Sequence, residues 1–278
     1  MNPEDALIAL ALAEDIGTGD ITTDALIPAA QMGRGVIVAK EALIVCGIEA
    51  VRRVFNAVDP DTRIDLACQD GDRVTAGTTV MAASGRMASL LKAERTALNF
   101  LQRLSGIATH VRTYADALPK GVTTRLVDTR KTTPGWRALE KYAVRVGGAA
   151  NHRMGLYDGV LIKDNHIAAC GGVATAVARA RSGVHHLVKV EVEVGDFAQL
   201  AQALEAGADV IMLDNMPITD VKEAVTRIGG RALSEVSGNV SLESLGALAG
   251  TGVDIISVGA LTHQARSVDL SMRITAVD

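Results

Sequence analysis

The sequence predicts an α/β fold whose larger, carboxyl-terminal part is a barrel, or an incomplete barrel, of parallel strands. From residue 124 onward, short β-branched apolar runs alternate with Ala-rich helical patterns, and such alternation is typical of parallel strands joined by right-handed crossovers. Polar residues follow the ends of these runs, and in a barrel such positions converge on one mouth. A doubly wound open sheet, in which the same positions spread along an edge, remains an alternative.

The repeating part of the chain supplies six expected strands. They are residues 125–128, 159–162, 187–194, 209–213, 232–236 and 254–258. The expected helices are residues 135–147, 172–182, 196–207, 218–229 and 241–250, several of them followed by a glycine that would end the helix. Six strands are too few for the eight of a full barrel, so the barrel is incomplete unless earlier residues add strands.

Before residue 110 the pattern changes and indicates a separate α+β domain. Residues 33–39 and 43–48 are expected to be strands, residues 49–57 a helix, and residues 69–85 have the turn-rich spacing of antiparallel β structure. A strong amphipathic pattern over residues 90–104 predicts a helix that bridges to the barrel. The first residues also predict an amphipathic helix, because they begin acidic and lack the basic segment of a signal peptide.

Composition limits the classes of function. Aromatic residues make up 3% of the 278 residues and the formal net charge is −4, which disfavours nucleic-acid binding and favours a small ligand. Three widely spaced cysteines suggest neither a disulfide framework nor a zinc site. No apolar run reaches the roughly 18 residues of a membrane span. We therefore expect a reduced cytoplasmic protein with no membrane segment.

Positive charge is concentrated in one segment of this acidic chain. Residues 128–166 contain seven Lys/Arg and two His against four acidic residues. Arg137, Lys141 and Arg145 recur every four residues and are expected on the solvent face of a helix. The remaining cations lie in turn-like sequence or at the end of an apolar run, and they are the candidate site for a small anion: Arg130, Lys131, His152, Arg153 and Lys163.

Each of these cations also has a plainer interpretation. Arg130 and Lys131 could be turn residues before a helix that opens at Pro134, and Lys163 could be a solvent lysine at the end of a strand. His152 and Arg153 follow a small-residue stretch and, taken alone, are typical of an exposed loop.

Acidic residues follow the later strands. Glu191 and Glu193 share one face of their strand, where buried carboxylates need cations or a metal, and Lys189 on the same face is one candidate partner. Asp214 ends the next strand, where capping of the following helix is the alternative. Ser237, Gly238 and Gly259 belong to the last two units, where α/β barrels commonly bind phosphate.

Longer motifs carry a resemblance to a known family. The segments ERTALNFLQRLSGIAT, DTRKTTPG, YAVRVGGAANHRMGL, LIKDNHI, EVEV, IMLDN, SGN and VGALTH occur in this order, within a match from about Glu14 to Leu270. In these segments the chain closely resembles the quinolinate phosphoribosyltransferases. The resemblance implies a type II phosphoribosyltransferase-like fold: an α/β sandwich domain of residues 1–105, completed by residues 266–278, and an incomplete α/β barrel of residues 106–265 that carries the active site.

The resemblance also implies a reaction and its residues. Quinolinate and phosphoribosyl pyrophosphate would react with Mg²⁺, and without an organic cofactor, to nicotinate mononucleotide, pyrophosphate and CO₂. Arg130, His152, Arg153 and Lys163 match the quinolinate positions, and Arg95 matches an arginine contributed across a homodimer interface. The positions around the sugar phosphates and the metal match Thr129, Lys131, Glu193, Asp214, Ser237, Gly238, Asn239, Gly259 and His263, with Lys131, Glu193 and Asp214 expected to be catalytic. Glu193 and Asp214 are the candidates for metal contact, directly or through water.

One departure from the family pattern and two rival functions remain. Asn239 stands where the familiar phosphate loop has a second glycine, which we interpret as a variation in phosphate contact. A Schiff-base aldolase using Lys163 would explain neither the other cations nor the phosphate loop. A paralogue associated with molybdenum transport, or a non-catalytic anion-binding protein, is the closer alternative. Assembly beyond a dimer is left open.

Overall fold

The computed structural model describes residues 3–277, which form two compact units. The first unit contains the residues up to 112 together with residues 132–148 and those from 264 onward. The second contains residues 113–131 and 149–263. The chain first passes from one unit to the other within a single long helix, α4 (Met87–Ala117).

The first unit is built on a four-stranded antiparallel sheet with the strand order β12-β1-β5-β3. The central strand β1 (Met32–Ala39) pairs with β5 (Thr79–Arg86) and, over its whole length, with β12 (Leu270–Val277). At the other edge β3 (Arg63–Leu66) pairs with β5. The last strand of the chain therefore lies in the same sheet as the first.

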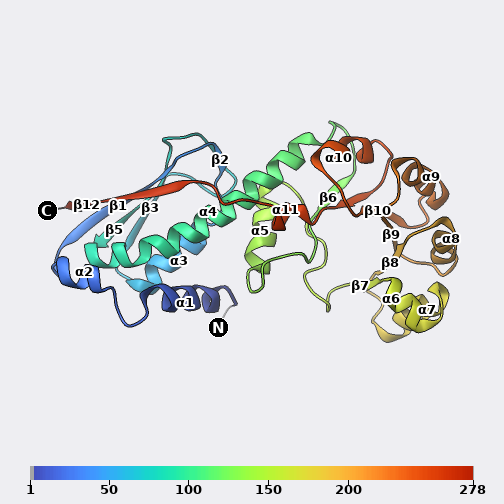
Figure 1. Cartoon of the computed structure of the whole chain (residues 1–278), viewed down its shortest axis with the longest axis horizontal. Helices are drawn as coiled ribbons and strands as arrows, with labels where there is room; N and C mark the ends of the chain where they lie inside the picture. The colour runs from blue at the N-terminus through green and yellow to red at the C-terminus, as the bar shows by residue number, and fades with distance from the viewer. Residues whose placement is uncertain (1–2, 278) are drawn as a thin grey trace. The chain divides into compact units, whose positions relative to one another are not determined.

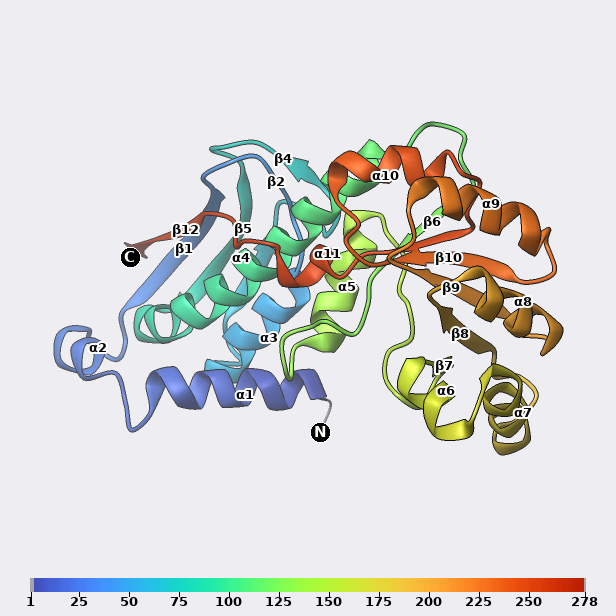
Figure 2. The same ribbon diagram turned by 45° about the vertical axis from the view of Figure 1, so that its right-hand side comes forward.

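Helices α3 and α4 run along this sheet (Figures 1 and 2). In α3 (Ile48–Val58) the buried residues Val51, Val54 and Phe55 recur at helical spacing, so the helix packs through one apolar face. The remaining elements of the unit are α1 (Pro3–Ile16), α2 (Ile21–Leu26), α5 (Arg137–Gly147) and a two-stranded ladder of β2 (Leu43–Ile44) and β4 (Arg73–Val74).

Two details of the first unit differ from expectation. The strand expected at residues 43–48 stops at Ile44, because the Ser105 hydroxyl group bonds the amide of Cys46 at 2.9 Å and its carbonyl oxygen at 3.1 Å. Gly47 then adopts a left-handed φ of 106°. The short elements α2 and β3 are not predicted by the sequence, since neither carries a clear periodic pattern.

The prediction that Lys141 lies on the solvent face of the helix at residues 135–147 is wrong. In α5 both Lys141 and Glu140 are fully buried, whereas Arg145 is exposed. The covered face of the helix also includes Leu139, Ala143 and Val144, so it is wider than the apolar stripe alone indicates. The Glu140 carboxylate accepts hydrogen bonds from Arg103 and Thr133, which offsets the cost of burying it.

The second unit is a six-stranded parallel sheet that does not close. Its order is β6-β11-β10-β9-β8-β7, so β6 and β7, although consecutive in the chain, form the two edges. The strands are β6 (Arg125–Val127), β7 (Val160–Ile162), β8 (Val190–Val194), β9 (Val210–Asp214), β10 (Leu233–Ser237) and β11 (Ile255–Ser257). The expected α/β fold with an incomplete barrel is confirmed.

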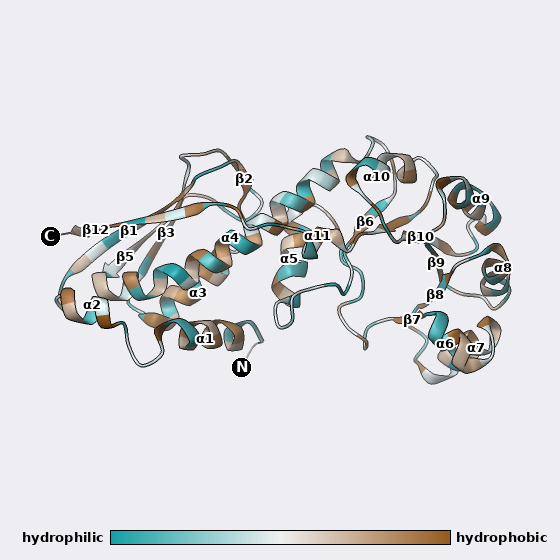
Figure 3. Cartoon of the chain, viewed as in Figure 1, coloured by the Kyte–Doolittle hydropathy of each residue, from teal (hydrophilic) through white to brown (hydrophobic). Residues whose placement is uncertain are grey.

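Helices follow the strands and lie along the outside of this sheet (Figure 2). Colouring by hydropathy shows polar and apolar residues side by side on these helices (Figure 3), as expected for elements with one face on the sheet and one in water. They are α7 (Val173–Gly183), α8 (Phe197–Glu205), α9 (Ile218–Ile228) and α10 (Leu242–Ala249), with the short helix α11 (Ala260–His263) after the last strand.

The region around residue 163 differs from expectation. Lys163 follows the end of β7 as expected, but a helix that was not expected, α6 (Asp164–Cys170), begins directly after it. The Lys163 amide donates to Nδ1 of His166 at 3.0 Å. The strand expected from residue 187 begins only at Val190, since the amide of Val188 turns back to the carbonyl of His185. Across residues 3–277, no helix has both the length and the apolar character needed to cross a bilayer.

Candidate active site at the strand ends

The strand register places the acidic candidates on one face of the parallel sheet. Paired residues in neighbouring parallel strands share a face, and the face alternates with period two. Because Glu193 pairs with Met212 and Asp214 pairs with Ser237, the side chains of Glu193, Asp214 and Ser237 belong to the same face. Lys163 continues that face one residue past β7, since Leu161 pairs with Glu191. These four residues lie at the carboxyl ends of consecutive strands.

Lys163 and Glu193 form an ion pair across the ends of β7 and β8. The side chain of Lys163 remains 45% exposed and that of Glu193 16% exposed, so the pair lies at the surface of the strand-end region. Lys189, which the sequence offered as a partner for these glutamates, is exposed before the strand begins. Glu193 is instead paired with Lys163, and Glu191 with His152.

Arg153 lies within electrostatic reach of a second cation. Burial and then the nearby Arg130 guanidinium lower the pKa of Arg153. Its Nη1 donates to the carbonyl of Gly159 at 3.0 Å, which directs the half-buried side chain. Two guanidinium groups this close repel each other, and an anion bound between them would relieve that repulsion.

A buried aspartate fixes the segment that carries His152 and Arg153. Ala150 makes a parallel bridge to Val127 beside β6, which is the open edge of the sheet. Asp128 is fully buried and accepts hydrogen bonds from Asn151 Nδ2 at 2.6 Å and from the His152 amide at 2.8 Å. Irregular backbone at the edge of the barrel is thus held by a carboxylate at the end of the adjacent strand.

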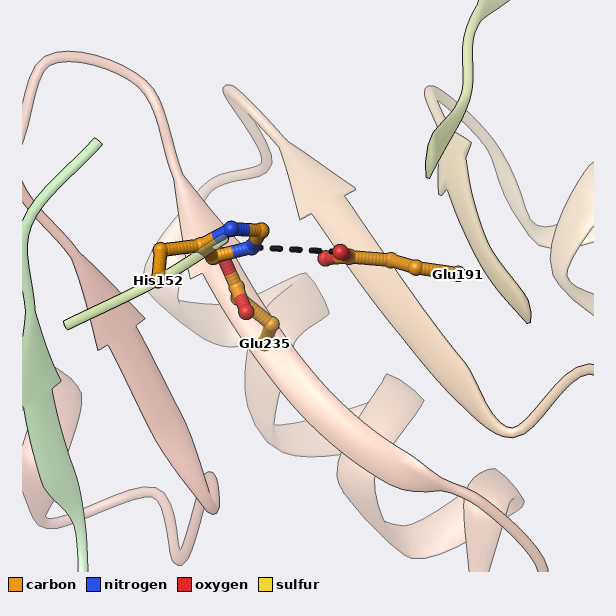
Figure 4. Close-up of side chains that lie close together, drawn as sticks. All are labelled: His152, Glu191 and Glu235. Carbon is orange, nitrogen blue, oxygen red and sulfur yellow. Dashed lines mark ion pairs between the residues drawn. The ribbon is translucent and has the colours of Figure 1, made fainter. Parts of the chain in front are cut away.

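The imidazole of His152 has two buried glutamates, Glu191 and Glu235, beside it (Figure 4). Its Nε2 is 3.1 Å from Oε2 of Glu191 and 3.5 Å from Oε1 of Glu235. Glu191 and Glu235 are only 6% and 1% exposed. Burial and, secondarily, the negative charge of Glu191 raise the pKa of Glu235 to about 7, so the Glu235 carboxyl group is partly protonated at neutral pH.

These three residues have the side chains of a metal site, yet the hydrogen bonds oppose that role. One ligand atom from each lies within 4.8 Å of the others. However, Nδ1 of His152 accepts the Arg153 amide at 2.7 Å, so in the neutral ring the proton is on Nε2, the atom that would have to bind the metal. A metal-bound histidine normally donates from its other nitrogen.

The ends of β9 and β10 are joined by a chain of asparagine contacts. Asn215 Nδ2 donates to Asp214 at 3.0 Å, and Asn239 Nδ2 donates to Asn215 Oδ1 at 3.0 Å. Both asparagines have left-handed φ angles, 55° and 47°, which asparagine tolerates better than most residues. Gly238 follows the last residue of β10 and precedes Asn239. A Cβ added to Gly238 would lie 2.3 Å from Asn215 Oδ1. Since α9 has Pro217 as its N-cap residue, Asp214 does not cap that helix.

Lys131 and His263 meet over Gly259. A Cβ on Gly259 would lie 2.8 Å from Cδ of Lys131 and 3.3 Å from Nε2 of His263. The Lys131 carbonyl accepts from the Thr262 hydroxyl at 2.7 Å, and the Lys131 amide donates to the Thr129 hydroxyl at 3.1 Å. The absence of a side chain at residue 259 therefore allows this close approach.

The structure thus gathers most of the sequence candidates but not all of them. Those in the second unit lie at the strand ends or in the segments that follow, whereas Arg95 is exposed on α4 in the first unit. Sequence reasoning missed Asp128, Asn215 and Glu235 as site residues. Glu235 could have been found from the sequence, because it is the single acidic residue of β10 and a buried carboxylate needs a partner.

This arrangement is suited to binding a compact polyanion. It combines cationic side chains, backbone in left-handed conformations near Gly238, and carboxylates on the same face of the sheet. Cations and exposed amides bind carboxylate and phosphate groups, while carboxylates can bind hydroxyl groups or a hydrated cation.

Comparison with known proteins gives a consistent result. The model of the quinolinate phosphoribosyl transferase N-terminal domain matches residues 20–105, and that of the C-terminal domain matches residues 107–273. A probable nicotinate-nucleotide pyrophosphorylase (carboxylating) from Bacillus subtilis is 46% identical over 94% of this chain and 90% of its own length. A chloroplastic nicotinate-nucleotide pyrophosphorylase from Arabidopsis thaliana is 41% identical over 97% of this chain and 82% of its own length.

Solved structures agree with these relatives. The crystal structure of NadC from Streptococcus pyogenes has a TM-score of 0.95 and 42% identity, covering 99% of this chain and 97% of its own. The nicotinate-nucleotide pyrophosphorylase from Francisella tularensis has a TM-score of 0.93 and 41% identity, covering 99% and 96%. Both family models and close relatives match nearly the whole length, and the chain therefore belongs to the quinolinate phosphoribosyltransferase family.

Proposed function

We propose that the chain transfers the phosphoribosyl group of phosphoribosyl pyrophosphate to quinolinate, releasing pyrophosphate and CO₂ and forming nicotinate mononucleotide for de novo NAD biosynthesis. The observation that carries this proposal is the full-length match to enzymes named for that reaction. The cationic strand-end region supports it, since both substrates are small polyanions.

Quinolinate would be held by the cations of the second unit. Arg130, Arg153 and Lys163 provide positive charge for its two carboxylates, and the mutual repulsion of the two arginines favours occupation by an anion. His152 belongs to the same set and lies between Arg153 and the buried glutamates. Lys163 is already paired with Glu193, so a bound carboxylate would compete with or extend that pair.

Phosphoribosyl pyrophosphate would occupy the ends of the later strands. The positions proposed for it are Thr129, Lys131, Glu193, Asp214, Ser237, Gly238, Asn239, Gly259 and His263. The close packing of Lys131 and His263 over Gly259, and the left-handed backbone at Gly238 and Asn239, support phosphate contacts there.

Glu193 and Asp214 fit a role beside a substrate-bound Mg²⁺. Both are carboxylates at the ends of neighbouring strands and on one face, and oxygen atoms are the ligands that Mg²⁺ prefers. When bound, the ion would neutralise charge on the leaving pyrophosphate. Asp214 is oriented by Asn215, and Glu193 by Lys163, so each can contact the ion directly or through water.

The chemistry follows from the charges of the substrates. As pyrophosphate leaves, positive charge develops at the anomeric carbon of ribose, where Glu193 and Asp214 would stabilise it while Lys131 contacts the phosphates. The quinolinate nitrogen then bonds to that carbon and becomes a pyridinium. Loss of CO₂ leaves an electron pair on the carbon beside N⁺, and a proton completes nicotinate mononucleotide. The substrate thus supplies its own electron sink, so an organic cofactor is not required.

Arg95 is proposed to act across a homodimer interface. Its exposed position on α4 supports this role. Mixing inactive Arg95→Ala and Lys163→Ala proteins under conditions that exchange subunits should then restore activity, because one of the two sites in a mixed dimer is intact. Unchanged inactivity of exchanged mixtures would assign Arg95 to the site of its own chain.

Localisation in the cytoplasm is also proposed, because Cys46, Cys68 and Cys170 are free thiols, as is usual in a reducing compartment. The relative from Arabidopsis thaliana is named as chloroplastic, so relatives differ in this respect. Fractionation of the source cells would test it.

A product assay tests the central proposal. Purified protein with quinolinate, phosphoribosyl pyrophosphate and Mg²⁺ should release CO₂ and nicotinate mononucleotide, whereas nicotinate in place of quinolinate should react poorly. Lys163→Ala should raise the quinolinate KM and lower turnover, and wild-type kinetics in this variant would overturn its assignment. A non-catalytic anion-binding protein would bind quinolinate without forming product.

A separate trapping experiment tests the aldolase alternative. Borohydride reduction should trap no substrate on Lys163. The amine of this lysine is engaged in an ion pair with Glu193, whereas a Schiff-base lysine must attack as a free neutral amine.

A further inference from the structure

Both ring nitrogens of His152 are engaged by the protein. Nδ1 accepts a hydrogen bond from the backbone amide of Arg153 at 2.7 Å. On the opposite side of the ring, Nε2 faces Oε2 of Glu191 at 3.1 Å and Oε1 of Glu235 at 3.5 Å (Figure 4). A ring used in this way has no nitrogen directed at a substrate carboxylate.

The hydrogen bonds also select one tautomer. The Arg153 amide is a donor, so Nδ1 must keep its lone pair, and the ring proton is on Nε2. Oε2 of Glu191, at 3.1 Å, is positioned to accept from Nε2–H, so the neutral ring satisfies this closer contact. Oε1 of Glu235 lies at 3.5 Å and makes no hydrogen bond within residues 3–277. A doubly protonated ring would place an N–H against the Arg153 amide and lose that bond.

From this geometry we infer that Glu191, Glu235 and His152 form a positioning relay. Glu191 holds the neutral ring at Nε2, Glu235 lies beside the same nitrogen, and the ring in turn fixes the backbone of Arg153. His152 would then support quinolinate binding through Arg153 and would not itself bind a carboxylate. This inference rests on the proposed function, and it names the means by which one member of the quinolinate set acts.

The surroundings of the relay support a positioning role. Glu191 and Glu235 come from β8 and β10 inside the parallel sheet and are at least nine-tenths buried, so they are rigid supports. Oε1 of Glu191 and Oε1 of Glu235 make no hydrogen bond with any residue between 3 and 277, so His152 Nε2 is the polar group that faces these two carboxyl groups. The preceding backbone is held as well, because the His152 amide donates to Asp128 at 2.8 Å. Arg153 is thus located by contacts on both sides of His152.

Nitrogen-15 NMR of the intact enzyme tests the tautomer directly. With labelled histidine, the His152 signals, identified by their loss in His152→Asn, should show a protonated Nε2 and an unprotonated Nδ1. Saturating quinolinate should leave this pattern in place. Protonation of both nitrogens on adding quinolinate would overturn the inference, since it would make the ring a cationic ligand of the substrate. This readout does not depend on turnover.

Kinetics test the coupling to Arg153. In His152→Asn, Oδ1 takes the place of Nδ1 and can still accept the Arg153 amide, whereas His152→Leu cannot. We expect His152→Leu to raise the quinolinate KM about tenfold, the effect of one lost hydrogen bond of ordinary strength, and His152→Asn to raise it several-fold less. Equal losses in the two variants would indicate a charge contact and contradict the relay.

A double-mutant cycle completes the test. If His152 acts through Arg153, adding His152→Leu to Arg153→Ala should raise the quinolinate KM little further, whereas independent contacts would give multiplied effects. Glu191→Leu should raise the quinolinate KM about as much as His152→Leu does. Glu205→Leu, at an exposed position, is the matched control and should leave this KM unchanged. Absence of quinolinate turnover in the wild-type enzyme would reject the proposed function. Multiplied effects of the two substitutions on the quinolinate KM, in an active enzyme, would reject only the relay.

Discussion

At the scale of single residues, backbone conformation explains the departure from the family's phosphate loop. Asn239 has a φ of 47°, a left-handed conformation that glycine adopts freely and asparagine tolerates. Its side chain also bonds Asn215, which is itself left-handed and bonds Asp214. The asparagine thus has a backbone conformation that glycine would adopt freely, and its side chain links two strand ends.

Gly259→Ala should impair phosphoribosyl pyrophosphate use. The added Cβ would lie 2.8 Å from the Lys131 side chain and 3.3 Å from His263, so both would have to shift. We expect the KM for this substrate to rise roughly tenfold, as for about 1.4 kcal/mol of lost binding. Steady-state kinetics would show it, and Gly246→Ala, which meets no atom within 4 Å, is the control. Equal kinetics for the two variants would argue against a phosphate contact by Lys131.

Glu235→Gln should change how stability depends on pH. The pKa of Glu235 is raised from 4.5 to about 7 by burial and by Glu191. The folded state therefore holds this proton more tightly than the unfolded state, and the resulting stabilisation is present below pH 4.5 and lost as the pH rises through 7. Wild-type protein should lose on the order of 1–3 kcal/mol over this range through this group.

The side chain of residue 235 cannot titrate in Glu235→Gln, so the free energy of unfolding of this variant should not fall through this group as the pH rises. Urea unfolding at several pH values from 5 to 8 would measure the difference between the two proteins. Parallel pH profiles would mean that Glu235 carries no retained proton.

At the scale of elements, α5 shows how a helix can bury charges. Its Glu140 carboxylate accepts from Arg103 Nη2 at 2.9 Å and from both the amide and the hydroxyl of Thr133, at 3.1 and 2.9 Å. These bonds fix the turn that follows Lys131 to the helix and to α4. The spacing of cations on α5 predicted a solvent face because sequence periodicity reports which residues share a face, and not which faces the rest of the unit covers.

Glu140→Leu should destabilise the first unit strongly. It would leave the Arg103 guanidinium and the Thr133 amide without their acceptor, and breaking a buried pair in this way costs about 3–5 kcal/mol. Glu140→Gln keeps an acceptor and should lose less. Denaturant unfolding would rank the variants, with the exposed Glu205→Leu as control. A change below about 0.5 kcal/mol in Glu140→Leu, typical of surface sites, would contradict this role.

At the scale of the whole molecule, chain order and spatial order differ. The first unit contains the segment of α5 and the end of the chain, although the second unit lies between them in sequence. Strand β12 pairs with all eight residues of β1 and forms one edge of the sheet. Glu41 reinforces this connection by pairing with Arg266 and accepting the Asp269 amide, contacts that lower the pKa of Glu41 to about 2.

Removal of residues 270–278 should therefore damage the first unit, although these residues are far in sequence from β1, with which β12 pairs. β1 would be left as a long unpaired edge, which favours aggregation. We expect a lower Tm and larger particles in size-exclusion chromatography, with Ser271→Ala as a full-length control. A monodisperse truncated protein with the Tm of the wild type would show that β12 is dispensable.

Local sequence located most of the fold and part of the site. The six parallel strands and the helices between them follow from hydrophobic periodicity and glycine stops, and Lys163, Glu193 and Asp214 could be recognised because polar residues at strand ends are conspicuous. Helix α6 was missed because its seven residues contain no buried one and so show no apolar period.

What the sequence by itself determined was the class of the fold, the family and the residue types available for binding an anion. Only the tertiary structure decided which of them are partners. Glu191 and Glu235 meet His152 across 39 and 83 residues of sequence respectively, through the register of parallel strands. Periodicity specifies the face on which a side chain lies, but the partner on that face depends on strand order and register, which are set by packing of the whole sheet.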